Sequence, residues 1–387
     1  MIQTKASSGQ SQAASPKDLG GVLTATAKKH WRSGWSVAAD QGLLRLLMPE
    51  QIGGTGLDAQ AFVRFMMELG QGCQDNGLAM GLNSHVWTVQ QTLVRFGSDA
   101  QRDLYLPALM SGQAIGAFAL TEKRAGSDAL SMDMTASPKD GGYVLNGTKC
   151  FVGMGPVCDI AIVFAKTDPS KGRWGVSAFL LDKDDPGFER LSKQEKMGLT
   201  SVPLGKLQLN DCWIPSDRLL GHEGMGGAII QTVLDWERSF ILASQVGAME
   251  RQLAECTDFC KSRTVFGQNI ASYQSVSNRL ADMRVRIETS RLMVEKAARL
   301  YDANASLTQY AAMTNLHVSE AFLASSMDAM RIFAGRGYMA GATTATDLQD
   351  ATGGILYSGT SDIQRQIISA IEQKSRPLSP EPKDRGR

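Results

Sequence analysis

The chain has 387 residues, of which 43% are hydrophobic and 20% are charged, a composition typical of a globular protein with two or three packed domains. Its 40 basic and 39 acidic residues leave a formal net charge of +1 without a basic stripe, so we expect no nucleic-acid binding. No apolar run approaches the roughly 18 residues of a membrane-spanning helix, and no secretory signal is recognisable, so we expect a cytoplasmic protein with no membrane contact.

The two ends of the chain differ in composition from the rest. Residues 1–16 are rich in Ser, Gln and Ala, and residues 375–387 are rich in Pro and in charges of both signs. Neither segment has enough apolar side chains to offset the entropy lost on ordering, so we expect a disordered leader and a disordered tail.

The first third of the chain has a helical pattern. Between residues 17 and 111, apolar residues recur at helical spacing, as at Phe62, Met66 and Leu69. The segment 49–56 contains one Pro and three Gly, and it predicts a turn between two such helices. We therefore expect an N-terminal helical domain over residues 17–111.

From residue 112 to residue 221 the pattern changes to short apolar runs. The pair Asn146-Gly147 follows the run 143–145, and Asn-Gly between apolar runs predicts a β-hairpin turn. Further strands are expected at 160–165, at 175–181, and around Leu207 and Leu209, which alternate with polar residues. The middle domain is therefore expected to be a small antiparallel sheet or barrel.

Long helices return between residues 222 and 374. An apolar stripe runs from Leu242 to Cys260, and two more helices are expected over 276–294 and 307–333. Helices of this length are typical of a four-helix bundle. The order of helices, strands and long helices excludes a doubly wound sheet, in which strands and helices alternate.

The six cysteines do not form a metal-binding pattern. None belongs to a Cys-x-x-Cys pair, and no histidine lies at zinc-finger spacing from them. Cys256 and Cys260 are four residues apart, but they continue the apolar stripe of their helix, so we expect core thiols rather than metal ligands. Free buried thiols are typical of a reducing cytosol.

Four motifs together resemble the acyl-CoA dehydrogenase family. Residues 118–128 read Phe-Ala-Leu-Thr-Glu-Lys-Arg-Ala-Gly-Ser-Asp, similar to the family's Thr-Glu-x-x-x-Gly-Ser-Asp. The other three follow in the family's order: Arg-Thr-Val-Phe-Gly-Gln at 263–268, Gly-Arg-Gly-Tyr at 335–338, and Leu-Tyr-Ser-Gly-Thr-Ser-Asp-Ile-Gln-Arg at 356–365. The resemblance covers about residues 20–373. It implies an α+β fold with an N-terminal helical domain, a middle antiparallel β domain and a C-terminal four-helix bundle, and it implies FAD as the cofactor.

The resemblance also implies which residues hold FAD. In the family, the first motif bonds the pyrimidine edge of the flavin through its backbone and its Thr, and its Ser meets the pyrophosphate. Backbone N–H groups suit that edge because reduction builds negative charge there. The implied set is Phe118, Leu120, Thr121, Gly126, Ser127, Phe151, Gly153, Arg263, Phe266, Arg331, Gly335, Thr360 and Asp362.

The motif at 263–268 contacts the FAD of a neighbouring subunit in the family, which implies a homodimer or homotetramer. An ordinary cationic helix end followed by a glycine cap would also explain Arg263 and Gly267. The turn at 335–338 also has two interpretations: a site for the adenine end of FAD, or a helix C-cap followed by a turn.

Three positions depart from the family pattern. Gly153 stands where members commonly carry a Ser or Thr whose hydroxyl bonds flavin N5, so this donor is lost. Arg331 replaces a Gln, and Gln349 replaces an Arg. The departure at Gly153 leaves the flavin's reactivity toward oxygen open.

The catalytic base is the largest departure. Ser358 stands where many members carry the catalytic Glu, and a Ser is no base at neutral pH without help. Glu237 lies where the isovaleryl-type branch places its base, so the resemblance implies that Glu237 takes this role. The alternative is a solvent-facing cluster of Asp235, Glu237 and Arg238 at the start of a long helix, where acidic residues are favourable.

The mechanism implied by the resemblance is an α,β-dehydrogenation of an acyl or aminoacyl thioester. Glu237 removes the α-proton, flavin N5 takes the β-hydride, and the Ser358 N–H with a ribityl hydroxyl of FAD bonds the thioester carbonyl. The implied substrate-binding residues are Asp235, Arg238, Tyr357 and Gly359.

The carrier of the substrate and the electron acceptor are left open by the sequence. The motif at 356–365 and the run 175–180 are similar to branches acting on carrier-protein-bound groups in secondary metabolism, including prolyl-carrier dehydrogenases, whereas Asp235 and Arg238 resemble the isovaleryl-CoA branch. We expect a carrier-bound substrate, with a short branched acyl-CoA as the alternative. An electron-transfer flavoprotein or oxygen would accept the electrons, and a flavin oxidase or monooxygenase on the same fold is the competing class.

Overall fold

The computed structural model describes residues 15–28 and 30–375. The leader and tail predicted from composition therefore lie outside the described residues, apart from their inner ends. There the prediction is wrong, because the first helix already begins at Pro16 and the last helix extends to Ser375. Ser15 caps the first helix by accepting a hydrogen bond from the Asp18 N–H, which satisfies one of the unpaired donors at the helix start.

Among the residues that the structure describes, six α-helices precede the sheet, and the helical pattern predicted for this part of the chain is confirmed. They are α1 (Pro16–Ala27), α2 (Trp31–Asp40), α3 (Ala59–Gly72), α4 (Asn76–Ser84), α5 (Gln91–Phe96) and α6 (Asp99–Met110). The apolar stripe of α3 is buried, including Phe62, Met66 and Leu69. The predicted turn at 49–56 lies between α2 and α3 and contains a short 3-10 turn.

One eight-stranded sheet forms the middle of the chain. Its strands are β1 (Gly116–Ala119), β2 (Thr135–Lys139), β3 (Gly142–Gly153), β4 (Ile160–Lys166), β5 (Val176–Asp182), β6 (Phe188–Arg190), β7 (Leu204–Pro215) and β8 (Leu219–Leu220). The order is β6-β7-β3-β2-β4-β5-β8, with β1 added on β4. The sheet is mainly antiparallel, as predicted, but β1 and β2 both pair with β4 in parallel.

The hairpin turn predicted at Asn146-Gly147 is wrong. Strand β3 continues through both residues, and the tight turn lies at Asp140-Gly141, between β2 and β3, where both residues have the positive φ that a two-residue hairpin turn requires. The Asn146 amide donates to Asp211 Oδ1 of β7 at 3.1 Å and accepts from the Asp211 N–H at 2.8 Å. The register of β3 and β7 shifts at this point, so Asn-Gly forms a bulge here.

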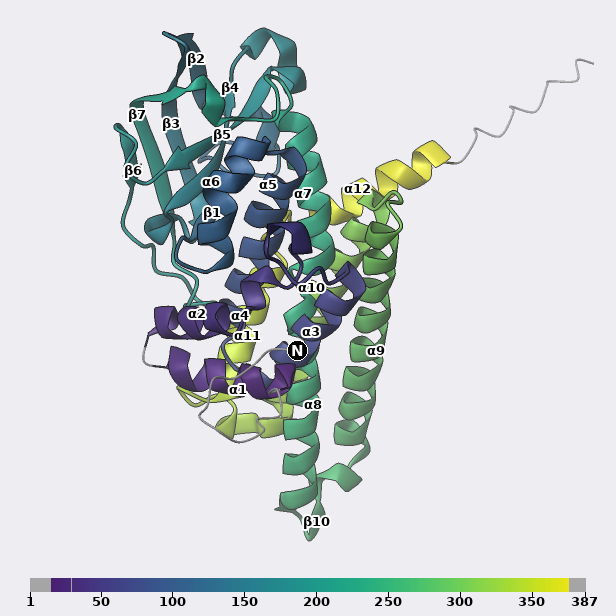
Figure 1. The fold of residues 1–387 in the computed structure, drawn as a ribbon. Coiled ribbons are helices and arrows are strands. Elements are labelled where there is room, and N and C mark those ends of the chain that lie inside the picture. The colour runs from purple at the N-terminus through teal and green to yellow at the C-terminus, as the bar shows by residue number, and fades with distance from the viewer. Residues whose placement is uncertain (1–14, 29, 376–387) are drawn as a thin grey trace, which may run out of the picture.

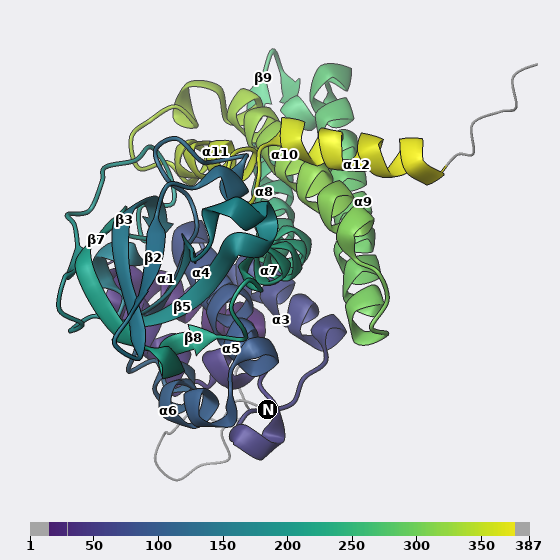
Figure 2. The same ribbon diagram turned by 90° about the horizontal axis from the view of Figure 1, so that it is seen from above.

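In the described part of the chain, which ends at residue 375, six α-helices follow the sheet. They are α7 (Gly226–Phe240), α8 (Ala243–Ser262), α9 (Gln274–Asp302), α10 (Thr308–Phe333), α11 (Thr343–Gly354) and α12 (Ser361–Ser375), and a small hairpin of β9 (Thr264–Val265) and β10 (Gln268–Asn269) lies between α8 and α9. The three long helices predicted from apolar stripes are confirmed as α8, α9 and α10. The sheet lies on one side of the molecule and α9 on the other, with α7 between them (Figure 1, Figure 2).

The prediction that Glu237 lies near the start of a long helix is wrong. Helix α7 begins at Gly226, after the Gly-rich loop, and Glu237 lies near its C-terminal end. The apolar residues Ile229, Ile230 and Val233 are already helical, because they bury the face of α7 that packs into the core. Asp235 and Arg238 are buried, so the alternative of a solvent-facing cluster at a helix N-terminus does not hold.

The cysteines predicted to be core thiols are buried. Cys256 and Cys260 are buried free thiols in the core of α8, and the described part of the chain contains no group of metal-ligating side chains. Among the described residues, no helix is both long enough and apolar enough to cross a membrane.

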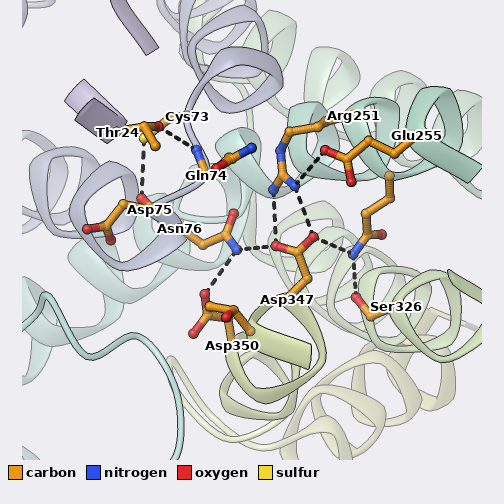
Figure 3. Close-up of polar contacts among 12 residues, drawn as sticks. Thr24, Cys73, Gln74, Asp75, Asn76, Arg251, Glu255, Ser326, Asp347 and Asp350 are labelled. Atoms are coloured by element: carbon orange, nitrogen blue, oxygen red, sulfur yellow. Dashed lines mark hydrogen bonds and ion pairs between the residues drawn. The ribbon is translucent and has the colours of Figure 1, made fainter. Parts of the chain in front are cut away.

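A buried polar network joins the N-terminal helices to the C-terminal ones (Figure 3). The Arg251 guanidinium of α8 forms a two-pronged ion pair with Asp347 of α11, with N–O distances of 3.0 and 3.1 Å. The Asn76 amide of α4 donates to Asp347 at 2.8 Å and to Asp350 at 3.0 Å. Asp350 also accepts from the Leu199 N–H, in the loop before β7, at 2.5 Å. The network therefore connects all three parts of the chain.

Removing Arg251 should destabilise the protein strongly. In Arg251→Met the Asp347 carboxylate stays buried without its cation, which costs about 3–5 kcal/mol. Urea unfolding followed by circular dichroism measures this loss. The matched variant Arg64→Met, which breaks the more exposed pair with Glu295, should cost less than about 1 kcal/mol. Equal losses in the two variants would contradict the assigned role of the network.

Candidate active site

Two segments far apart in the sequence meet through one hydrogen bond. The Arg238 Nε of α7 donates to the main-chain carbonyl of Ser358, in the loop before α12, at 3.0 Å. The Gln364 amide of α12 donates to the same carbonyl at 3.1 Å and to the Gly359 carbonyl at 2.9 Å. Ser358 and Gly359 both have positive φ, 61° and 97°. The two side chains therefore hold a short left-handed turn that few L-residues adopt unaided.

This turn leaves the Ser358 N–H free. Among the described residues no acceptor bonds this N–H. The Ser358 hydroxyl makes no hydrogen bond of good geometry, but it lies close enough to the Glu237 carboxyl to lower the pKa of that group. A donor held in place by a clamped backbone and left without a partner is what an oxyanion site requires. Gln364, which fixes the turn from the α12 side, was not singled out from the sequence, although it belongs to the quoted motif at 356–365.

Glu237 lies beside this turn. Burial raises the pKa of its carboxyl, while the nearby Ser358 hydroxyl and the Arg238 guanidinium act in the opposite direction. The Glu237 side chain keeps partial solvent access despite the dense surroundings. A carboxyl with a raised pKa and an open face is suited to accept a proton from a weak carbon acid.

Tyr357 lies close to the same carboxyl. Burial raises the pKa of its phenol, and the charges of Asp350 and Glu237 raise it further. Tyr357 therefore stays neutral and lies within the electrostatic range of both carboxyls.

Asp235 is turned away from Glu237 toward the start of α10. Its carboxylate accepts from the Thr308 hydroxyl at 2.7 Å and from the Gln231 amide at 3.0 Å, and Arg238 Nη1 lies 3.7 Å away. Burial raises the pKa of Asp235, and these three neighbours oppose the shift. The predicted substrate contacts of Asp235 and Arg238 stay predictions, and what the structure adds is that Arg238 supports the Ser358 turn.

The residues of the first flavin motif lie at the end of β1 and in the loop after it. Phe118 is packed edge-on against Phe164, with ring centroids 5.0 Å apart. The Thr121 carbonyl accepts from the Cys150 N–H of β3 at 2.7 Å, which ties the motif to the strand carrying Phe151 and Gly153. The remaining predicted residues of this motif, Gly126 and Ser127, are exposed.

Gly153 has room for a side chain. A Cβ added there would meet only Val202, at 3.8 Å, so the missing hydroxyl donor is a chemical difference from the family pattern and not a steric necessity. Phe151, two residues earlier, is 63% exposed and has a positive φ of 53°. A positive φ costs a non-glycine residue conformational free energy. A large apolar ring that is held exposed in spite of this cost is suited to cover a flat aromatic ligand.

The loop 198–202 lies between strand β3, which carries Phe151 and Gly153, and the segment that leads into the Ser358 turn. Val202 lies against Gly153, whereas Leu199 packs on Gly353, the glycine that also contacts Tyr357. The strand that carries the predicted flavin residues and the loop that carries Ser358 are thereby held close together.

A second group of predicted flavin residues lies at the far end of the helices. The β9–β10 hairpin, with Arg263 directly before it, lies at the end of the molecule opposite the sheet (Figure 1). Phe266 at its tip is 93% exposed. Arg331 and Gly335 lie nearby at the end of α10, because Phe333 stacks on Phe259 of α8 with ring centroids 4.5 Å apart. This group does not meet the first group within one chain.

Thr360 and Asp362 flank the start of α12. The Thr360 hydroxyl accepts from the Ile363 N–H at 3.3 Å, and the exposed Asp362 pairs with Arg365 at 3.3 Å. The two residues follow directly after the Ser358 turn, and their predicted contact with FAD stays a prediction.

The donor set of the site fits FAD. The Thr121 N–H has no hydrogen-bond partner in the part of the chain that the structure describes, and it lies in the same motif as the open Gly126, whose missing Cβ would meet no atom within 4 Å. A free N–H suits a flavin's pyrimidine edge, and an unobstructed glycine suits a phosphate. Glu122 of this motif forms a buried ion pair with Lys149 of β3. The sequence signal for the pair was a lysine at a buried position of an apolar strand.

Comparison with known proteins agrees with this geometry. Family models for the N-terminal, middle and C-terminal domains of acyl-CoA dehydrogenase match residues 23–113, 117–212 and 224–371. The L-prolyl-[peptidyl-carrier protein] dehydrogenase of Pseudomonas fluorescens is 37% identical over 337 residues, which cover 87% of this chain and 88% of that protein.

Solved structures have the same fold. A prolyl acyl carrier protein oxidase, AnaB, superimposes with a TM-score of 0.89 at 34% identity, covering 92% of this chain and 97% of that one. PigA with FAD and proline gives 0.87 at 33% identity, covering 95% and 99%. The chain belongs to the acyl-CoA dehydrogenase family.

Proposed function

We propose that this chain is a FAD-dependent dehydrogenase that oxidises the α,β-bond of an acyl or aminoacyl thioester, with Glu237 as the base. The observation that carries the proposal is that the Glu237 carboxyl lies beside the clamped Ser358 turn, whose main-chain N–H has no acceptor among the described residues. FAD, when bound, supplies the acceptor for the β-hydride.

The protein's own residues then have three tasks. The Ser358 N–H bonds the thioester carbonyl, which acidifies the neighbouring α-C–H, and a donor of this kind is worth about 3–4 kcal/mol in related oxyanion sites. Glu237 takes the α-proton, and its raised pKa reduces the mismatch with that proton. Arg238 and Gln364 hold the Ser358 N–H in position through the carbonyl of the same residue.

We infer that the substrate is presented on a carrier protein. The Pseudomonas fluorescens relative and AnaB are both named for a prolyl group on a carrier, and the PigA structure contains proline. The short-branched acyl-CoA alternative depended on Asp235 and Arg238, and in this chain Arg238 bonds the Ser358 carbonyl while Asp235 faces Thr308. An aminoacyl thioester of secondary metabolism therefore accounts better for the chain than an acyl-CoA.

The assembly and the acceptor form part of the same proposal. Because Arg263, Phe266, Arg331 and Gly335 lie far from the first flavin motif, a second subunit would have to bring them to FAD, as a homodimer or homotetramer does. Electrons pass to an electron-transfer flavoprotein or to oxygen. The six free thiols support a cytoplasmic setting.

Glu237→Gln should abolish flavin bleaching by substrate while FAD stays bound. In the unchanged enzyme the bleaching rate should fall as the pH drops through the pKa of Glu237, because only the carboxylate accepts the α-proton. Since burial raises that pKa, the loss should occur at a higher pH than for an ordinary glutamate. Stopped-flow absorbance at the flavin band measures both effects. Near-normal bleaching in Glu237→Gln would refute the base assignment.

Ser358→Ala should be mild, with less than about a tenfold loss of rate, or about 1.4 kcal/mol. The substitution keeps the main-chain N–H and removes only a hydroxyl that makes no hydrogen bond of good geometry among the described residues and lies near the Glu237 carboxyl. In contrast, Gln364→Leu removes a donor from the carbonyls of Ser358 and Gly359 and should slow bleaching more. A loss above a hundredfold in Ser358→Ala would show that the hydroxyl itself takes part.

The carrier is tested by presenting one saturated prolyl group in two forms, on a carrier protein and on CoA, to the anaerobic protein. We expect bleaching by the carrier form and little by the CoA form, because the relatives are named for the former. Bleaching by CoA alone would place the chain with the catabolic acyl-CoA dehydrogenases. No bleaching by several acyl and aminoacyl groups would contradict the dehydrogenase proposal.

A further inference from the structure

A buried ion pair joins Glu122 of the flavin motif at 118–128 to Lys149 of β3, and it has no part in the mechanism above. Lys149 of β3 is completely buried, Glu122 is 5% exposed, and their Nζ and Oε1 atoms are 2.7 Å apart. Burial lowers the pKa of Lys149 to about 8, and the adjacent carboxylate of Glu122 opposes this shift. A buried pair costs desolvation free energy that packing alone would avoid, so its position is informative.

The pair has a definite orientation. Lys149 Nζ also donates to the Leu120 carbonyl at 3.0 Å, so its positive charge touches the main chain of the flavin motif. The Glu122 carboxylate accepts from the main-chain N–H groups of Asp133 at 2.6 Å and Met134 at 3.1 Å, which precede β2. The positive end of the pair therefore contacts the Leu120 carbonyl, whereas the negative end is bonded by N–H groups of another segment.

The Leu120 carbonyl and the Thr121 N–H belong to one peptide group. The carbonyl is bonded to an ammonium, whereas the N–H has no acceptor among the described residues. A charged donor on the oxygen polarises the amide, and hydrogen bonds in such a chain strengthen one another. The Thr121 N–H is thus a strengthened donor available to a ligand.

We infer that Lys149 is a positioning residue for the flavin, which raises the cofactor's affinity for electrons through the Leu120–Thr121 peptide. Reduction builds negative charge on the pyrimidine edge of a flavin, and a strengthened N–H with a buried cation behind it favours that charge. The inference depends on the proposed binding of FAD by this motif, and it adds a residue whose side chain does not touch the cofactor.

The test is the midpoint potential of bound FAD, measured against a reference dye in Lys149→Met and in the double variant Glu122→Gln with Lys149→Met. Both should lower the equilibrium constant for two-electron reduction at least tenfold, which corresponds to about 30 mV. The double variant keeps the test decisive if the single variant fails to fold, because it leaves no uncompensated buried carboxylate. The double variant also leaves the net charge of the protein unchanged. A lower potential in it would therefore result from the loss of the Lys149 ammonium beside the Leu120 carbonyl.

The matched control is Arg218→Met with Asp182→Asn, which removes a half-buried ion pair between the end of β5 and the residue before β8, outside the flavin motif and the Arg251–Asp347 network. Its potential should equal that of the unchanged protein. The inference would be overturned if the double variant at 122 and 149 had the potential of the unchanged protein. It would also be overturned if the control shifted the potential by the same amount. Either outcome would leave the proposed function intact. Failure of the unchanged protein to bind FAD would instead refute the proposed function.

Discussion

The active-site geometry depends on the hydrogen bonds to one main-chain carbonyl, that of Ser358. Arg238 reaches it from α7 and Gln364 from α12, and together they hold a turn whose positive φ values are unfavourable for a serine. Without these two donors the turn would relax, and the N–H on its other side would lose its direction. Because Arg238 adjoins Glu237 in the sequence, the same helix end places the proposed base and fixes the proposed oxyanion donor.

The buried polar network extends this constraint to the rest of the fold. Asp350 fixes the Leu199 N–H, and the loop 198–202 in turn lies between the flavin strand at Gly153 and the glycine against which Tyr357 packs. Asp347 of α11 binds Arg251 of α8, a helix that follows the sheet in the sequence, and Asn76 of α4, a helix that precedes it (Figure 3). The distance between the hydride-accepting and proton-accepting sides of the site is therefore set by packed, hydrogen-bonded elements, as a reaction at two adjacent carbons requires.

Much of the fold could be predicted from periodicity, because burial enforces it. The stripes of α3, α8, α9 and α10 follow from side chains that face the core. The local errors have specific causes. Asn146-Gly147 has the composition of a hairpin turn, but pairing with Asp211 across β7 makes it a bulge. The start of α7 was misplaced because the glycines at 226 and 227, poor helix formers, form its first turn.

The candidate site was less predictable, because the residues that form it are brought together by contacts between distant segments, and the spacing of residues in the sequence does not show these contacts. Glu237 and Ser358 were named through family resemblance, but no sequence pattern shows that Arg238 would bond the Ser358 carbonyl 120 residues away. Lys149 and Gln364 were missed for the same reason: each acts on a main-chain atom of a residue that the motifs already contained.

In the proposed mechanism the base, Glu237, and the N–H that bonds the thioester carbonyl, that of Ser358, belong to different parts of the sequence. This affects how such sequences are classified. In the proposed mechanism position 358 contributes only its main chain, so its side chain is free of catalytic selection provided that it tolerates a left-handed backbone. A search that scores the side chain at this position would label a working enzyme as a degenerate, inactive paralogue. A search for an acidic residue near the end of the first long helix after the sheet, followed directly by an arginine, would recognise it.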